Sequence, residues 1–196
     1  MNKLESICVF CGSSEGNDHE IIEQANALGK KLAEKEITLV YGASKRGIMG
    51  EVAKSCLDNH GKVVGAIPQF LKLKEVVHLG LTELITTENM HDRKLKMQEL
   101  SDGFIALPGG FGTLEELFEI TTWAQLGLHQ KPIALLNTGG FFNHLIAMME
   151  EMVRRGFLRM DNFEMVIIDD DIDRLIDKMH NFKPLPKPQW LKPERT

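Results

Sequence analysis

The chain has 196 residues, of which 43% are hydrophobic and 26% are charged, and these fractions are ordinary for a globular protein with a sizeable core. Its net charge of −5 argues against a general binder of nucleic acid or of membrane surfaces. No apolar run approaches a membrane span, and the first residues lack the long apolar stretch of a secretion signal, so we expect a cytoplasmic protein.

Two of the three cysteines, Cys8 and Cys11, form a C-x-x-C at the end of the first apolar run. In a redox motif this sequence opens a helix, whose N-terminus lowers the thiol pKa. Here Gly12 and two serines follow, and the third cysteine, Cys56, does not complete a disulfide framework. We therefore interpret Cys8 and Cys11 as residues at the end of a strand.

Short apolar runs alternate with amphipathic segments along the chain. The runs predict strands at 7–10, 38–41, 63–67, 83–87, 104–107, 133–136 and 165–168. The amphipathic segments predict helices at 18–35, 47–59, 89–101, 113–126, 141–155 and 171–181. This alternation is typical of βαβ units and predicts an α/β fold, a Rossmann-like open parallel sheet with helices on both faces.

Residues 1–183 are predicted to form a single domain of this kind, followed by a proline-rich tail at 184–196. Four prolines in ten residues exclude a helix in the tail. We expect the tail to be disordered or to contact a partner through Trp190.

Loops of small residues follow three of the predicted strands. The first strand is followed by CGSS, the second by YGASKRGIMG and the fifth by PGGFGT. In an open parallel sheet the carboxyl ends of the strands form one edge, where ligands bind. The dinucleotide and Walker fingerprints are absent from the sequence. Backbone N–H groups at helix N-termini bind anions, so the three loops together favour a phosphate site over simple tight turns.

Two interpretations are open for Glu116. Thr113 and Glu116 are three residues apart at the predicted start of a helix, which is the spacing of a capping box. Alternatively, the carboxylate addresses a part of the ligand other than its phosphate. Glu115 points to another side of the helix, and we expect it to be solvated or paired.

A second candidate lies in the predicted helix at 89–101. Met90, Arg93, Met97 and Leu100 are spaced to lie on one helical face, so Arg93 shares an apolar stripe. A guanidinium group there requires an anionic partner, because unpaired burial is costly. The partner is either a structural carboxylate or a ligand, and the neighbouring Lys94 either adds charge toward a phosphate or is solvated.

These segments resemble a known family. PGGFGTLEE resembles the P-G-G-x-G-T-x-x-E motif of the LOG ("Lonely guy") cytokinin riboside 5′-monophosphate phosphoribohydrolases, and MHDRK is similar to that family's M-H-E-R-K. The resemblance covers about residues 5 to 160. Two departures are visible: Ala43 and Ser44 replace glycines in the second loop, and Phe111 stands where tyrosine is common.

The resemblance implies a hydrolase that cleaves the N-glycosidic bond of a nucleoside 5′-monophosphate, with cytokinin nucleotides or AMP as substrate. It places the catalytic pair on Arg93 and Glu116. It places substrate contacts on Glu75, Arg93, Lys94, Gly110, Phe111, Gly112, Thr113, Leu114, Glu115, Glu116 and Thr122, with Ser13, Gly42 and Met49 from the first two loops.

The resemblance also implies a homodimer. The expected chemistry demands no metal, and we expect no cofactor. The histidine spacing gives no metal signature. The alternative is a nucleotide-binding or carrier protein of the same fold without turnover. The presence of both Arg93 and Glu116 favours the enzyme, because a carrier requires the phosphate loop but not the acid.

Overall fold

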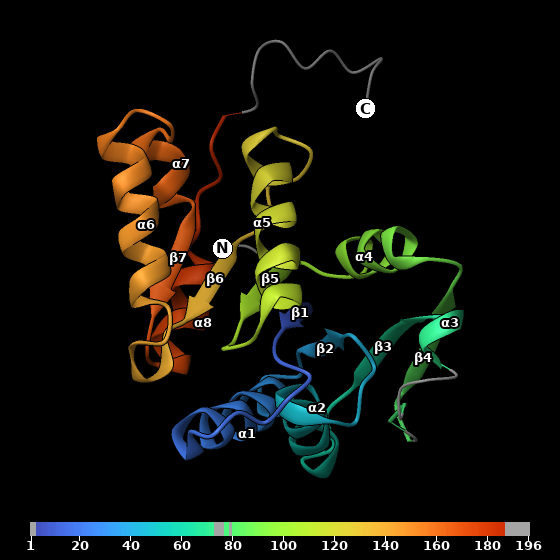
Figure 1. Ribbon diagram of the computed structural model, residues 1–196. Coiled ribbons are helices and arrows are strands. Elements are labelled where there is room, and N and C mark those ends of the chain that lie inside the picture. Colours follow the sequence, from blue (N-terminus) through green and yellow to red (C-terminus); the bar gives the residue numbers. More distant parts are fainter. Residues whose placement is uncertain (1–2, 73–76, 79, 187–196) are drawn as a thin grey trace.

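Seven strands form one sheet in the computed structural model, which describes residues 3–72, 77–78 and 80–186 (Figure 1). Their order across the sheet is β4-β3-β2-β1-β5-β6-β7, and every neighbouring pair is parallel. The strands are β1 (Ser6–Phe10), β2 (Thr38–Tyr41), β3 (Val63–Pro68), β4 (Glu83–Thr87), β5 (Gly103–Ala106), β6 (Ile133–Leu136) and β7 (Val166–Asp169). Parallel strands of this kind are buried on both faces, which explains why they appear in the sequence as continuous apolar runs.

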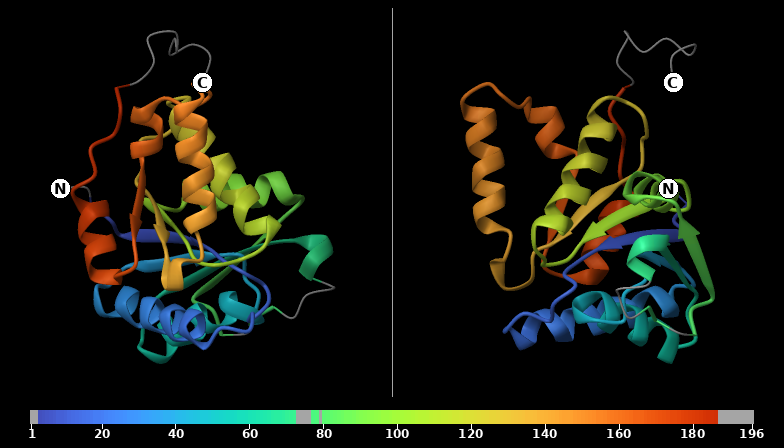
Figure 2. Two further views of the ribbon diagram at one scale, coloured as in Figure 1. Left: turned by 60° about the vertical axis from the view of Figure 1, so that its left-hand side comes forward. Right: turned by 45° about the vertical axis from the view of Figure 1, so that its right-hand side comes forward.

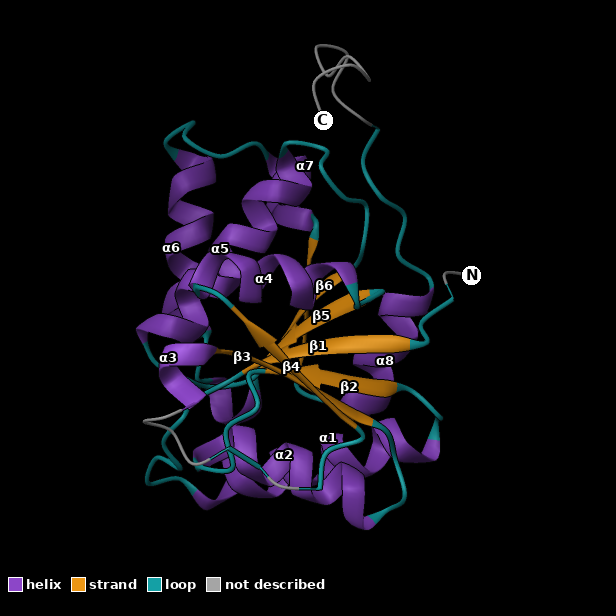
Figure 3. Cartoon of the chain, turned by 90° about the vertical axis from the view of Figure 1, so that its right-hand side faces the viewer, coloured by secondary structure: helices purple, strands orange, loops and turns teal. Residues whose placement is uncertain are grey.

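Helices cover the sheet on both sides (Figures 2 and 3). The helices α1 (His19–Glu34), α2 (Gly47–Asp58) and α8 (Ile172–His180) pack on one face. The other face is covered by α4 (Met90–Glu99), α5 (Phe111–Gln125) and α6 (Asn143–Arg154). Three short helices complete the chain: α3 (Gln69–Lys72), η1 (Thr138–Gly140) and α7 (Met160–Glu164). The predicted fold class is confirmed.

The predicted strands and the six predicted long helices agree with the observed bounds to within two residues. The three short helices are not predicted from the sequence. A helix of three to five residues spans little more than one turn, so it shows no hydrophobic period from which to recognise it.

The sheet order decides where the three small-residue loops lie. They follow β1, β2 and β5, which are adjacent in the order β2-β1-β5. The chain runs outward from β1 to β4 and then returns to the other side of β1 as β5. The loops thus meet at the point where the strand order reverses, which is where ligands bind in folds of this kind.

The two neighbouring cysteines are buried, as their assignment to a strand end requires. Cys8 lies in β1, Cys11 follows the strand directly, and neither is in a disulfide. Burial raises the pKa of both thiols well above the ordinary value. The next helix in the chain, α1, begins only at His19, so the C-x-x-C does not open a helix as it does in a redox motif.

Candidate active site

The two candidate catalytic side chains form a buried ion pair. Arg93 Nη2 lies 3.4 Å from Glu116 Oε1, and their side chains are only 9% and 10% exposed. Arg93 stands in the first turns of α4, which begins at the cap residue Asn89 just after β4. Glu116 stands on α5, which follows β5. Helices that leave different strands thus bring the two groups together at the carboxyl edge of the sheet.

Arg93 is seated against the second glycine loop. A side-chain carbon at Gly42 would collide with Arg93 Nη2 and would press on Met49 Sδ. On its other side Arg93 Nη1 donates to Met90 Sδ at 3.8 Å. The Nε–H of Arg93 is buried without a hydrogen-bond partner among the described residues. Because buried donors are normally hydrogen-bonded, a bound ligand could supply the acceptor for this N–H.

Glu116 is an unusual glutamate because of its surroundings. Burial raises its pKa above the ordinary value, and this effect outweighs the nearby Arg93 guanidinium, which lowers it. Glu115 and Glu119 also raise the pKa, whereas Lys94 lowers it. The carboxyl group is therefore held closer to protonation than an exposed glutamate, beside a permanent cation.

The predicted capping box is wrong. The cap of α5 is Gly110, whose extended backbone makes no side-chain cap hydrogen bond, and the helix begins at Phe111. Thr113 is therefore the third helical residue, and it is buried where its hydroxyl would meet any side chain at Gly109. Glycine serves as an N-cap nearly as well as threonine, so the helix starts two residues earlier than predicted. Glu116 caps nothing, and its carboxylate contacts Arg93.

The three small-residue loops bind to one another through their own amides. Gly12 donates its N–H to Pro108 O at 3.1 Å, and Met49 donates to Gly12 O at 3.2 Å. Gly47 has a φ of +60°, and a side chain there would collide with the backbone of Ser13. The first two loops therefore use these amides for packing. The N-terminal N–H groups of α5 have no acceptor within their own helix, so we expect an anion to bind at the third loop.

The second loop departs from the family pattern at Ala43. This buried residue has a φ of +62°, the left-handed conformation that glycine adopts at lower cost. Its carbonyl accepts from His78 N at 3.1 Å, and the next residue, Ser44, bridges to Val77. The loop thus keeps a glycine-like course in spite of the substitution, and it ties the stretch after β3 to the site.

The other predicted contacts lie around α5. Glu115 pairs with Lys94 at 2.5 Å, and Lys94 also contacts Glu119 at 2.9 Å. Phe111 is 93% exposed at the start of the helix, and Gly112 faces open space. Ser13 is exposed and Leu114 is half-buried. Glu75 lies outside the described residues.

Thr122 is not brought to the ion pair. It lies about 9 Å along the axis of α5 from Glu116, and its exposed side chain donates to Phe118 O. Its role as a substrate contact stays a prediction.

Sequence reasoning missed Glu119, although a signal was present. Glu119 follows Glu115 by four residues and Glu116 by three, which places it beside them on α5.

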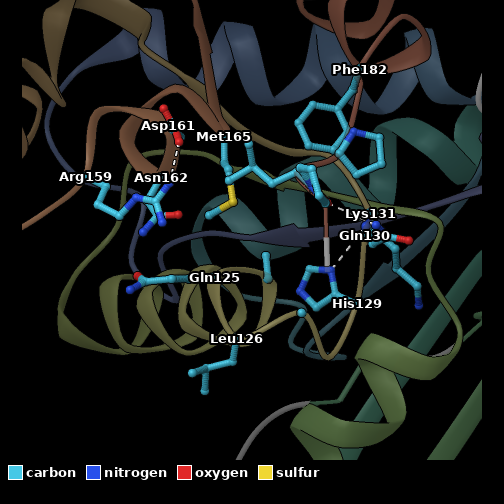
Figure 4. A pocket seen from close by; sticks show the side chains of 15 residues that line it. Gln125, Leu126, His129, Gln130, Lys131, Arg159, Asp161, Asn162, Met165 and Phe182 are labelled. Carbon is cyan, nitrogen blue, oxygen red and sulfur yellow. Dashed lines mark hydrogen bonds and ion pairs between the residues drawn. The ribbon is translucent and has the colours of Figure 1, made fainter. Parts of the chain in front are cut away.

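Two cavities lie in different parts of the molecule. One of about 410 Å³ lies between the first and third loops, where its lining includes Ser13 and Gly110 of the predicted site. The other, of about 430 Å³, lies beside the segments that precede β6 and β7, where its lining includes His129 and Met165 (Figure 4). None of the predicted site residues lines this second cavity.

The fold is shared with solved structures of low sequence identity. The molybdenum cofactor binding protein from Rippkaea orientalis has a TM-score of 0.67 and 23% identity, over 89% of this chain and 94% of that one. The molybdenum cofactor carrier protein from Chlamydomonas reinhardtii has a TM-score of 0.65 and 20% identity, over 89% and 95%. These likenesses show the fold alone.

Relatives of higher identity indicate the family. A family model described as "Possible lysine decarboxylase" matches residues 49–179. The chain is 40% identical to the "Probable cytokinin riboside 5'-monophosphate phosphoribohydrolase LOGL9" of Oryza sativa subsp. japonica, over 94% of this chain and 81% of that protein. It is also 40% identical to the "Cytokinin riboside 5'-monophosphate phosphoribohydrolase LOG3" of Arabidopsis thaliana, over 93% and 85%. The chain therefore belongs to the LOG family of cytokinin riboside 5′-monophosphate phosphoribohydrolases.

Proposed function

We propose that this protein hydrolyses the N-glycosidic bond of a nucleoside 5′-monophosphate and releases the free base and ribose 5-phosphate. The observation that carries the proposal is the buried pair of Arg93 and Glu116. Glu116 lies about one and a half turns from the N-terminus of α5. Relatives that share about 40% of the sequence are named for this reaction on cytokinin nucleotides.

The residues suit the chemistry of this bond. Loss of a base from ribose passes through a transition state that resembles an oxocarbenium ion, as in glycoside hydrolysis. In the proposed reaction the Glu116 carboxylate stabilises the developing positive charge and activates the attacking water. Arg93 orients the sugar through its Nε–H, which has no acceptor among the described residues. The N-terminal amides of α5 hold the 5′-phosphate.

The family model's description names a decarboxylase, and the relatives name a phosphoribohydrolase. We follow the relatives because an arginine–carboxylate pair beside an anion-binding helix N-terminus fits cleavage of a nucleotide. The proposed substrates are cytokinin nucleotides, which carry an apolar group on N6 of adenine, and AMP.

The direct test is to incubate the purified protein with a panel of nucleoside monophosphates and to measure released base and ribose 5-phosphate. We expect both products in equal amounts from at least one adenine nucleotide. Tight nucleotide binding without release of base from any of them would replace this proposal with the carrier function.

A homodimer in the cytoplasm also belongs to this proposal. In the described part of the chain, no helix is both long and apolar enough to cross a membrane. Support for the dimer comes from exposed apolar side chains on the helical layer of α4, α5 and α6, among them Leu95, Phe118 and Met148.

A further inference from the structure

A very small cavity lies behind Glu116, between α4 and α5. Its volume is about 10 Å³, which is roughly the room that a single water molecule requires. Four of its lining side chains are polar: Lys94 and Gln98 from α4, and Glu116 and Glu119 from α5. A site for one water needs two to four polar partners, so this cavity has both the size and the chemistry to hold one.

The ammonium group of Lys94 has one more N–H donor than its two carboxylate partners use. Its side chain is only 9% exposed, and its ammonium group lies 2.5 Å from Glu115 and 2.9 Å from Glu119. An ammonium group has three donors, so the third remains for another acceptor in the cavity. These contacts also connect α4 to α5 through a residue next to Arg93 and through residues one and three positions away from Glu116.

We propose that Lys94, Glu119 and Gln98 hold one water molecule against the Glu116 carboxylate, and that Glu119 and Gln98 are positioning residues for Glu116. The water hydrogen-bonds to the side of Glu116 that faces away from the substrate. It thereby adds a hydrogen bond to a buried carboxylate whose ion-pair partner is Arg93. The network sets the protonation of Glu116 without contacting the substrate. This proposal rests on the proposed function only for its kinetic readout.

The charged and titratable groups around Glu116 come from two helices, from β1 and from the loop after β1. Arg93 and Lys94 face it from α4, and Glu115 and Glu119 face it from α5. The thiols of Cys8 and Cys11, from β1 and the loop after it, also interact with it electrostatically. Burial holds these thiols protonated, so the charges that change the pKa of Glu116 are those of the two helices.

Two variants should act in opposite directions. Glu119→Gln removes a negative charge and frees Lys94 to approach Glu116, so the carboxylate form is favoured and the acidic limb of the kcat profile moves to lower pH. Gln98→Leu removes a partner of the water, so Glu116 is less solvated and the limb moves to higher pH. In both variants we expect kcat at the optimum to fall about tenfold, with KM changed less than about twofold.

Glu99→Gln is the matched control. Glu99 lies on the same helix, is exposed and pairs with Lys96, so its loss should leave the pH profile in place. If Glu119 and Gln98 had a merely structural role, the variants would lower kcat without moving the acidic limb, or the acidic limb would move in the same direction in both variants. Either result would overturn the proposal.

Two readouts do not depend on turnover. A high-resolution crystal structure of the wild-type protein should show one ordered water in contact with Glu116 and Lys94. The 13C NMR titration of the Glu116 carboxyl should shift in the same two directions in the variants. If the protein cleaves no nucleotide, the proposed function fails while these measurements still decide on the water site. A dry cavity, or titrations that coincide with the wild type, would refute it.

Discussion

At the scale of single residues, the site pairs the buried carboxyl group of Glu116 with the guanidinium group of Arg93, which packs against Gly42. Glu116 could have been a helix cap, and the structure removes that explanation because Gly110 caps α5. What remains is a carboxylate whose burial raises its pKa and whose nearest cation is Arg93 at 3.4 Å. A group held in this way costs stability and is typical of functional sites.

Glu116→Gln tests this interpretation. Since the folded protein has the higher pKa, stability falls as the pH rises from the ordinary carboxyl range through the raised value. Glutamine carries no charge, so the stability of the variant should depend less on pH than that of the wild type, while the buried Arg93 loses its carboxylate partner. Base release should fall by about 10²–10⁴-fold. Thermal unfolding and product assays at several pH values measure both. A folded variant with wild-type rates would defeat the catalytic role of Glu116.

Gly42→Ala tests the seat of Arg93. The new methyl group would collide with the guanidinium group, which is the flexible end of a side chain and can move away. We expect a folded protein whose turnover is about 10–100-fold lower, because a displacement of this size disturbs the reacting geometry. In an Arg93→Lys background the same change should cost much less. Equal losses in both backgrounds, in a double-mutant cycle, would show that Gly42 and Arg93 act independently.

At the scale of elements, α5 carries most of the site. Its N-terminus supplies the free amides, and its next turns carry Glu116 and Glu119. In the first two loops, the amides of Gly12 and Met49 donate hydrogen bonds to neighbouring loops. Phosphate recognition is therefore expected to rest on the start of α5, so nucleosides should be far poorer substrates than their monophosphates.

Gly112→Ala separates ligand binding from folding. Nothing in the described structure approaches the space that its side chain would fill, and alanine is the better helix former. The melting temperature should therefore stay the same or rise. A phosphate on the α5 amides would be crowded by the new methyl group, so KM for the nucleotide should increase about tenfold or more. An unchanged KM, measured by steady-state kinetics, would place the phosphate elsewhere.

At the scale of the whole molecule, a layer of helices covers each face of the sheet. The layer of α4, α5 and α6 has apolar side chains that remain exposed on its outer surface. Leu95, Phe118 and Met148 lie on these three helices. Exposed apolar surface of this kind is typical of a protein interface, and a second copy of the chain is the proposed partner.

Light scattering tests the dimer. At micromolar concentration the mass should be twice the chain mass of 22.1 kDa, and Phe118→Glu should reduce it toward a single chain. The substituted side chain already lies at the surface, so the monomer should stay folded by circular dichroism. A single-chain mass for the wild type would exclude the dimer at that concentration.

Local patterns were enough to predict the elements and the candidate side chains. Alternating apolar runs and helical periods predicted strands such as Thr38–Tyr41 without error, because period and propensity are properties of neighbouring residues. The loops after β1, β2 and β5, and the resemblance of PGGFGTLEE and MHDRK to the LOG family, identified Arg93 and Glu116 as candidates.

How these pieces meet depends on the folded arrangement of the chain. The strand order brings Gly42 to Arg93 and both to Glu116, although 74 residues of chain separate the first from the last. It also decided that Gly110 rather than Thr113 caps α5, and that the amides of Gly12 and Met49 serve packing instead of a ligand. Such outcomes depend on which groups compete for the same donor or the same space after folding, and no local pattern carries that information.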